Sequence, residues 1–271
     1  MTAERRLSNA PLVEVIAEIH WVLDDNMQGN PVDPSWFKMA MQIEPVLQSI
    51  LPVIEPLQPF GTVIPLDVLG REPLIRFRPK PGAWPLAQIG QGIVTVNATP
   101  PYDGWDAVRN LLSRILTSAR DASPLFAALR PERCQLTYRD AFTEDHGVTD
   151  IDHFLSKQVQ LINQSSLDIL SKVVGKPAII ATSEIRAAHP SLPNTNILVR
   201  GSRGQIKNTA TPRQAAILDF VVNGAPDLKP LDVASILSWF DQAHSCAWDV
   251  FTSVIPSDIM GNLKREKGSH A

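Results

Sequence analysis

The stretch GQGIVTVNATPPYDGWDAV, residues 90–108, carries the chain from one kind of secondary structure into another. Ile93 to Val96 has the β-branched content of a strand, and the turn residues Tyr102-Asp103-Gly104 follow it. From Trp105 to Ala119 apolar residues recur every three or four positions, which predicts an amphipathic helix with Asp103 as its N-cap. A strand that leads into such a helix predicts a sheet with helices packed on it.

Strand-like segments precede this unit. Residues 11–21 alternate apolar and polar side chains, the pattern of a half-buried strand. Pro34-Ser35 is a helix start, and the helix that follows contains Pro45 and carries the apolar residues Phe37, Met41, Val46 and Ile50. Between residues 52 and 85 prolines are too frequent for a long helix, so edge strands or bent hairpin arms are predicted in GTVIPLDVL (61–69) and PLIRFRP (73–79).

The second half of the chain repeats this order of elements. RCQLTYRDAFT (133–143) alternates like a strand, and TDIDHFLSKQVQLI (149–162) has the pattern of a capped helix that begins near Thr149. Three further strands are predicted in segments rich in Ile and Val: KPAIIATSEIRAAH (176–189), TNILVRGSRGQIK (195–207) and RQAAILDFVVNG (213–224). From Asp232 to Pro256 the spacing is helical again, as one long helix or two joined near His244.

The last helix predicted in each half of the chain contains a Trp-Asp pair, Trp105-Asp106 in the first half and Trp248-Asp249 in the second. Together with the matching order of elements, the two pairs predict a tandem duplication of a β-α-β-β-β-α unit. Its halves are residues 1–128 and 129–271, on one continuous sheet, with a charged tail from about residue 264. The predicted fold class is α+β: a mostly antiparallel, curved sheet with helices packed on one face and the other face open.

Composition and charge narrow the class of protein. The 271 residues include 25 Lys plus Arg and 28 Asp plus Glu, so the chain lacks the basic excess of a protein that grips nucleic acid along its whole surface. Cys134 and Cys246 stand in apolar settings, and both are predicted as buried thiols of a reducing compartment. The chain shows no signal peptide and no apolar run of about 20 residues, which predicts a cytoplasmic protein without membrane association.

Three stretches carry a family resemblance: NAPLVEVIAEIHW (9–21), GQGIVTVNATPPYDGWDAV (90–108) and AHSCAWDVFTSVIPSDIMGNL (243–263). In this order they resemble a sporadically distributed bacterial protein family of similar length and unknown function. The resemblance implies a bacterial origin, and the patchy distribution of that family is compatible with carriage in defence or toxin-linked loci. It supplies no catalytic signature.

Two clusters are candidates for chemistry. In TEDHGVTDIDHF (143–154), carboxylates and imidazoles stand close enough in sequence to hold a divalent metal, with His146, Asp150 and His153 as the ligands. The spacing matches no standard zinc or calcium loop, and a solvated cap in the first helical turn is the favoured explanation of Asp150 and Asp152. The second cluster is a basic hairpin that could contact phosphate, or else carries ordinary turn charges: Arg200, Arg203, Lys207 and Arg213.

Motifs of nucleophilic, zinc and P-loop chemistry are missing from the sequence: G-x-S-x-G, H-E-x-x-H, C-x-x-C and G-x-x-x-x-G-K-[ST]. We therefore predict a non-catalytic macromolecule-binding protein without a cofactor, whose partner is another protein, in an accessory or neutralising role in a bacterial defence or toxin-linked system. The alternatives are a saddle-like nucleic-acid-binding protein and a metal-dependent hydrolase or nuclease that uses residues 144–153. A homodimer through an open sheet edge is also compatible with the sequence.

Overall fold

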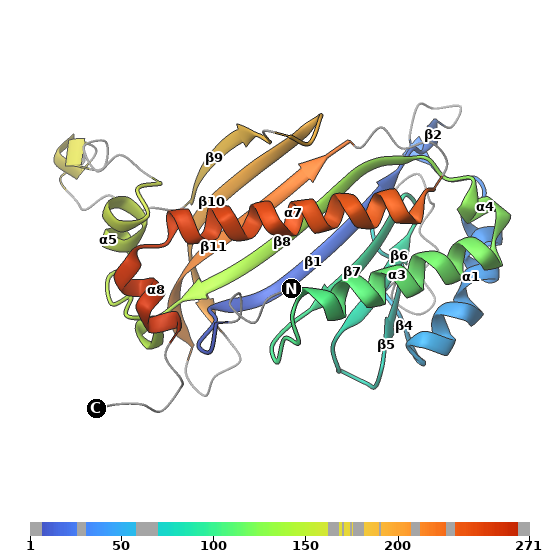
Figure 1. Ribbon diagram of the computed structural model, residues 1–271, viewed down its shortest axis with the longest axis horizontal. Helices are drawn as coiled ribbons and strands as arrows, with labels where there is room; N and C mark the ends of the chain where they lie inside the picture. The colour runs from blue at the N-terminus through green and yellow to red at the C-terminus, as the bar shows by residue number, and fades with distance from the viewer. Residues whose placement is uncertain are drawn as a thin grey trace.

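The structure, a computed structural model, describes residues 7–25, 31–57, 70–161, 168–169, 171–173, 175, 182–189, 191–206, 212–225 and 231–264. In these residues nine strands form one open, wholly antiparallel sheet in the order β4-β5-β6-β7-β1-β8-β11-β10-β9 (Figure 1). Its strands are β1 (Leu12–Trp21), β4 (Val53–Pro56), β5 (Ile75–Arg78), β6 (Leu86–Gly90), β7 (Ile93–Ala98), β8 (Pro131–Phe142), β9 (Thr182–Ala188), β10 (Thr195–Ile206) and β11 (Arg213–Gly224). The predicted α+β class with an antiparallel sheet is confirmed.

The helices and short elements complete the described chain. The α-helices are α1 (Trp36–Ile50), α3 (Trp105–Ala122), α4 (Pro124–Ala127), α5 (Ile151–His153), α7 (Val233–Val254) and α8 (Ser257–Leu263). A 3-10 turn η2 (Glu144–His146), a π-helical turn η3 (Phe154–Gln158) and a two-stranded ribbon of β2 (Asp24–Asp25) and β3 (Pro31–Val32) accompany them. Of the helices described, none is both long and apolar enough to cross a bilayer.

The centre of the sheet is the pair β1–β8, the first strands of the two predicted halves. Their register places Val15 opposite Tyr138 and Ile19 opposite Cys134. Outside β1 lies β7, which leads into α3, and outside β8 lies β11, which leads into α7. On each side of the central pair the next strand thus leads into a long helix, but four described strands lie outside β1 and three outside β8. The tandem duplication itself stays a prediction.

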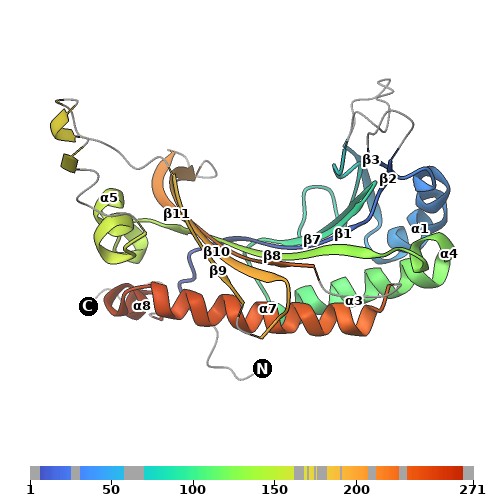
Figure 2. The same cartoon turned by 90° about the horizontal axis from the view of Figure 1, so that it is seen from above.

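Helices α3 and α7 lie on the same face of the sheet, as Figures 1 and 2 show. The core fills the space between them and the strands: α3 packs on β7, α7 packs on β8 and β11, and α1 packs on α3. Alternate residues of β1 point into this core, and Val15 and Ala17 have no exposed surface. The predicted period of two in residues 11–21 follows from this one-sided burial.

The two Trp-Asp pairs do not occupy equivalent positions. Trp105 is the first residue of α3 and is 2% exposed, whereas Trp248 lies in the fifth turn of α7 and is only half-buried. Helix α7 begins at Val233, where the Asp232 carboxylate accepts hydrogen bonds from two backbone amides. The shared dipeptide thus falls at different positions of two helices of unequal length, and the role of the pairs as repeat markers stays a prediction.

Local details also differ from the sequence prediction. Gly104, not Asp103, is the N-cap of α3, and its φ of +96° is one that an L-residue rarely adopts. In α1, Phe37 and Met41 are 67% and 78% exposed. The buried stripe is on a different face of the helix and consists of Trp36, Met39, Ala40, Ile43 and Leu47.

The predicted helix near Thr149 is only the short α5 followed by η3, and α7 is one continuous helix, not two. Cys134 is buried, which raises the pKa of its thiol to about 12, whereas Cys246 is only partly buried. The predicted strand at 61–69 and the tail beyond residue 264 lie outside the described residues.

Candidate functional site

The face of the sheet opposite α3 and α7 is the first candidate surface. Figure 2 shows that the sheet bends away from the helices at both ends, so this face is concave, and no described helix lies across its centre. The side chains on it are those that alternate with the buried positions of each strand. They are mostly polar, and hydrogen bonds join them across the strands.

A chain of hydrogen bonds crosses the concave face from β5 to β1. The Arg76 guanidinium donates to the Gln88 amide oxygen at 3.0 Å, and the Gln88 amide donates to the Thr95 hydroxyl at 3.3 Å. Thr95 donates to Asn97 at 2.7 Å, and Asn97 donates to the Glu14 carboxylate at 2.9 Å. Since each side chain is held by its neighbours, this part of the face is pre-organised.

Near one end of the central strands β1 and β8, burial suppresses the charge of side chains on the concave face. Burial, and next the Arg133 guanidinium, lower the pKa of His20 to about 4, so its imidazole is neutral at pH 7. Arg133 lies 2.9 Å from Nε2 of His20 and donates to it, since a guanidinium has only donors. Burial also raises the pKa of Glu18, whose carboxyl accepts a hydrogen bond from Gln135 at 2.6 Å.

On the other side of β8 the charges are paired. Arg139 donates to Asp219 at 2.8 Å, and Glu184 accepts from Arg200 at 2.8 Å and from Arg186 at 2.6 Å. Arginines and carboxylates thus alternate on the concave face, and this half of it presents both signs of charge.

The basic cluster predicted from the sequence is not one patch. Arg200 and Arg203 are three residues apart on β10, an odd spacing, so they point to opposite faces of the sheet. Arg203 pairs with Asp152 of α5, and Arg213 pairs with Asp145 at 2.7 Å. The fourth predicted residue, Lys207, lies outside the described part of the chain. The three described arginines are therefore neutralised by separate carboxylates.

The predicted metal ligands are likewise not brought together. His146 is 7% exposed, and its Nδ1 accepts the Thr143 backbone N–H at 3.0 Å in a capping box around η2. Asp150 caps α5 by accepting the His153 backbone N–H at 3.0 Å, and the His153 side chain is exposed. Within the described residues no three His, Cys, Asp or Glu side chains are grouped as a metal site requires.

Asp150→Ala is expected to lower the free energy of unfolding by about 1 kcal/mol, because it removes the side-chain cap of α5. Urea unfolding measures this loss, and Asp150→Asn is the matched control, since asparagine caps a helix about as well. Metal analysis of the wild type and both variants distinguishes a metal site at residues 144–153 from a helix cap. A stoichiometric metal in the wild type that both variants lose would contradict the capping role.

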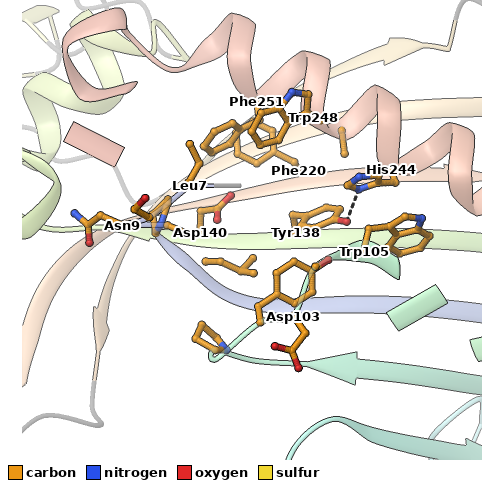
Figure 3. Close-up of a pocket in the computed structure, with 18 of the residues that line it drawn as sticks. Leu7, Asn9, Asp103, Trp105, Tyr138, Asp140, Phe220, His244, Trp248 and Phe251 are labelled. Atoms are coloured by element: carbon orange, nitrogen blue, oxygen red, sulfur yellow. Dashed lines mark hydrogen bonds between the residues drawn. The ribbon is translucent and has the colours of Figure 1, made fainter. Parts of the chain in front are cut away.

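The second candidate site is a half-enclosed cavity on the helix side of the sheet, which the sequence reasoning missed. Its volume is about 450 Å³, and it lies where the start of β1, the loop before α3 and the second half of α7 meet over β8 and β11 (Figure 3). Trp105 and Trp248 both line it, although their helix positions differ. The cavity separates a large core cluster under α3 from a smaller one near α8.

Aromatic and polar groups are fixed in the cavity wall. The His244 ring stacks on Trp105 with centroids 5.1 Å apart, and its Nδ1 lies 2.6 Å from the Tyr138 hydroxyl. The Trp105 indole N–H donates to Asp241 at 2.9 Å, which ties α3 to α7. Burial raises the pKa of Tyr102, which lies beside Tyr138, to about 12.

Asp140 is the carboxylic acid inside the cavity. It is 4% exposed, lies between Asn9 and Tyr138 in Figure 3, and no described group hydrogen-bonds its carboxyl. Burial, and next the charge of Asp219, raise its pKa to about 8, so it is protonated at neutral pH. The signal was present in the sequence: on β8, Asp140 shares the alternating core positions with Leu136 and Phe142, where an acid is rare.

No family model matches this chain, and no curated protein matches it in sequence. Function is therefore inferred from two features of the described residues, the concave face and the cavity.

Proposed function

We propose that the protein is a non-catalytic binding protein whose concave sheet face docks another protein. The observation that carries this proposal is the pairing of charges on a face that no described helix covers. Arg139 with Asp219 and Arg200 with Glu184 present both signs side by side. A nucleic-acid-binding face instead needs a run of cations that neutralises successive phosphates.

The size of the face is sufficient for a stable complex. Nine strands spaced by about 4.8 Å give a sheet roughly 40 Å wide, and strands of 12 residues, such as β8 and β11, are about 40 Å long. A protein interface of standard size buries about 800 Å² per partner, which is smaller than this face. Its hydrogen-bonded side chains are already ordered, which lowers the entropic cost of docking.

For the biological role we propose an accessory or neutralising component of a bacterial defence or toxin-linked system in the cytoplasm. This role rests on the family resemblance, while the binding mode rests on the sheet face. Pairing of two copies through the edge strands β4 and β9 is a separate prediction, which light scattering of the purified protein tests.

We expect Arg133→Ala to weaken binding of the partner about tenfold or more, because Arg133 is an exposed arginine on the concave face, on the central strand β8. The partner is first captured on the tagged chain in its native host and identified by mass spectrometry, and the affinity is then measured with purified components. Arg114→Ala is the matched control, an exposed arginine on α3 behind the sheet.

Two results would overturn the proposal. One is equal loss of affinity in the Arg133 and Arg114 variants. The other is a captured species that nuclease removes and whose affinity falls steeply with salt, since that would identify nucleic acid as the partner.

A further inference from the structure

The cavity under α7 has the size and lining of a small-molecule site. Ligand pockets usually enclose about 300–1,000 Å³ and are lined by apolar groups with a few polar ones. This cavity, at about 450 Å³, falls in that range. Its walls are mainly apolar and aromatic side chains: Leu7, Pro11, Leu12, Phe220, Ala247 and Phe251.

The charged side chains of the lining have one sign. Among the lining residues there are three aspartates, Asp103, Asp106 and Asp140, and no lysine or arginine. Asp103 and Asp106 are exposed at the rim, and Asp140 is buried inside. The two rim carboxylates repel an anionic ligand and attract a cation, and Asp140 attracts the cation inside the cavity once it has released its proton.

The aromatic walls favour the same charge. Trp248 and Phe251 stack with centroids 5.8 Å apart. Trp105 of α3, Tyr102 of the loop before α3 and Tyr138 of β8 also line the cavity. The face of an aromatic ring attracts an ammonium group that lies within about 6 Å of its centre, most strongly for Trp. We propose that this cavity binds a small organic cation, an amine or quaternary ammonium with an apolar body, whose charged group pairs with Asp140.

The buried acid explains why the site needs a cation. Without a ligand Asp140 holds a proton, since burial raises its pKa to about 8. When a cation enters, Asp140 releases this proton to solvent and the carboxylate pairs with the ligand. The other titratable groups that line the cavity are Tyr102, Asp103, Asp106, Tyr138 and His244. Asp219 acts on Asp140 by its charge from the concave face of the sheet.

The affinity should therefore depend on pH in a defined direction. Below the pKa of Asp140, the fraction of ionised Asp140 falls tenfold for each unit by which the pH is lowered. The affinity for a permanently charged ligand should therefore rise about tenfold from pH 6 to pH 7 and level off above pH 8. The cavity lies on the face opposite the proposed protein-binding face. The two proposals therefore stand or fall separately.

Isothermal titration calorimetry with benzyltrimethylammonium tests this proposal, with 2-phenylethanol and 3-phenylpropanoate as the neutral and anionic comparisons. We expect at least tenfold tighter binding of the cation at pH 8, with release of a proton at pH 7. Asp140→Asn should lower the affinity for the cation at least tenfold and remove its dependence on pH. Asp249→Asn, at an exposed position of α7 outside the cavity lining, is the matched control and should lower it less than threefold.

Three outcomes would overturn the proposal: binding of 2-phenylethanol as tight as that of the cation, no heat of binding with any cation up to about 1 mM ligand, or an Asp140→Asn variant that binds like the wild type. Quenching of tryptophan fluorescence by the ligand gives a second measurement, because Trp105 and Trp248 line the cavity. Circular dichroism of each variant verifies that it is folded.

Discussion

Replacing Trp105 with alanine is expected to lower the free energy of unfolding by about 3–5 kcal/mol. The side chain is 2% exposed, its ring stacks on His244 and packs against Phe240, and its indole N–H donates to Asp241. Removing the indole would leave an empty space that is continuous with the existing cavity. The surrounding side chains could therefore not close it by small shifts. Urea unfolding followed by circular dichroism measures the loss.

Trp248→Ala is the matched control for this prediction. Trp248 is the same residue type, follows the same dipeptide pattern and lines the same cavity, but it is half-buried on α7. We expect it to cost about half as much, because less apolar surface returns to water. Equal losses would contradict the inequivalence of the two Trp-Asp pairs.

The sequence predicts strands and helices well where one face of the element is buried. The alternation in β1 and β8 comes from residues such as Val15 and Leu136, which face the helices, while Glu18 and Gln135 face away. The order of the strands in the sheet is a different matter. It depends on pairings between residues more than a hundred positions apart, such as Val15 with Tyr138, which no local pattern encodes.

The errors have physical causes as well. In α1, both Phe37 with Met41 and Met39 with Ile43 have helical spacing, and only the packing on α3 decides which stripe is buried. The His146 and Asp150 cluster is a set of local caps, a reading that the sequence already allowed for Asp150. The cavity could not be predicted, because its walls come from both ends of the chain.

Asp140→Asn is expected to raise the free energy of unfolding by about 5 kcal/mol at pH 8 and to leave it nearly unchanged near pH 4. The pKa of Asp140 is raised from 3.8 to about 8 in the folded protein, so the folded state holds its proton more tightly than the unfolded state does. The contribution of this group to stability is therefore complete below about pH 4 and is lost as the pH rises through 8. An amide has no proton to lose, so the variant escapes this loss.

The quantity to measure is the difference between variant and wild type in urea unfolding at several pH values. His20 has a lowered pKa of about 4, so its contribution has the opposite pH dependence: stability is lost as the pH falls below about 6.5. This contribution is the same in both proteins and cancels in the difference. Asp106→Asn, exposed at the cavity rim, should stay within about 0.5 kcal/mol of the wild type at every pH. An Asp140→Asn variant that is less stable at all pH values would show that the carboxylate is ionised and bound in the folded protein. A buried acid that destabilises the protein at neutral pH is expected to be retained because it binds a ligand. If so, Asp140→Asn should gain stability and lose affinity for the cation, and the two measurements together test this expectation.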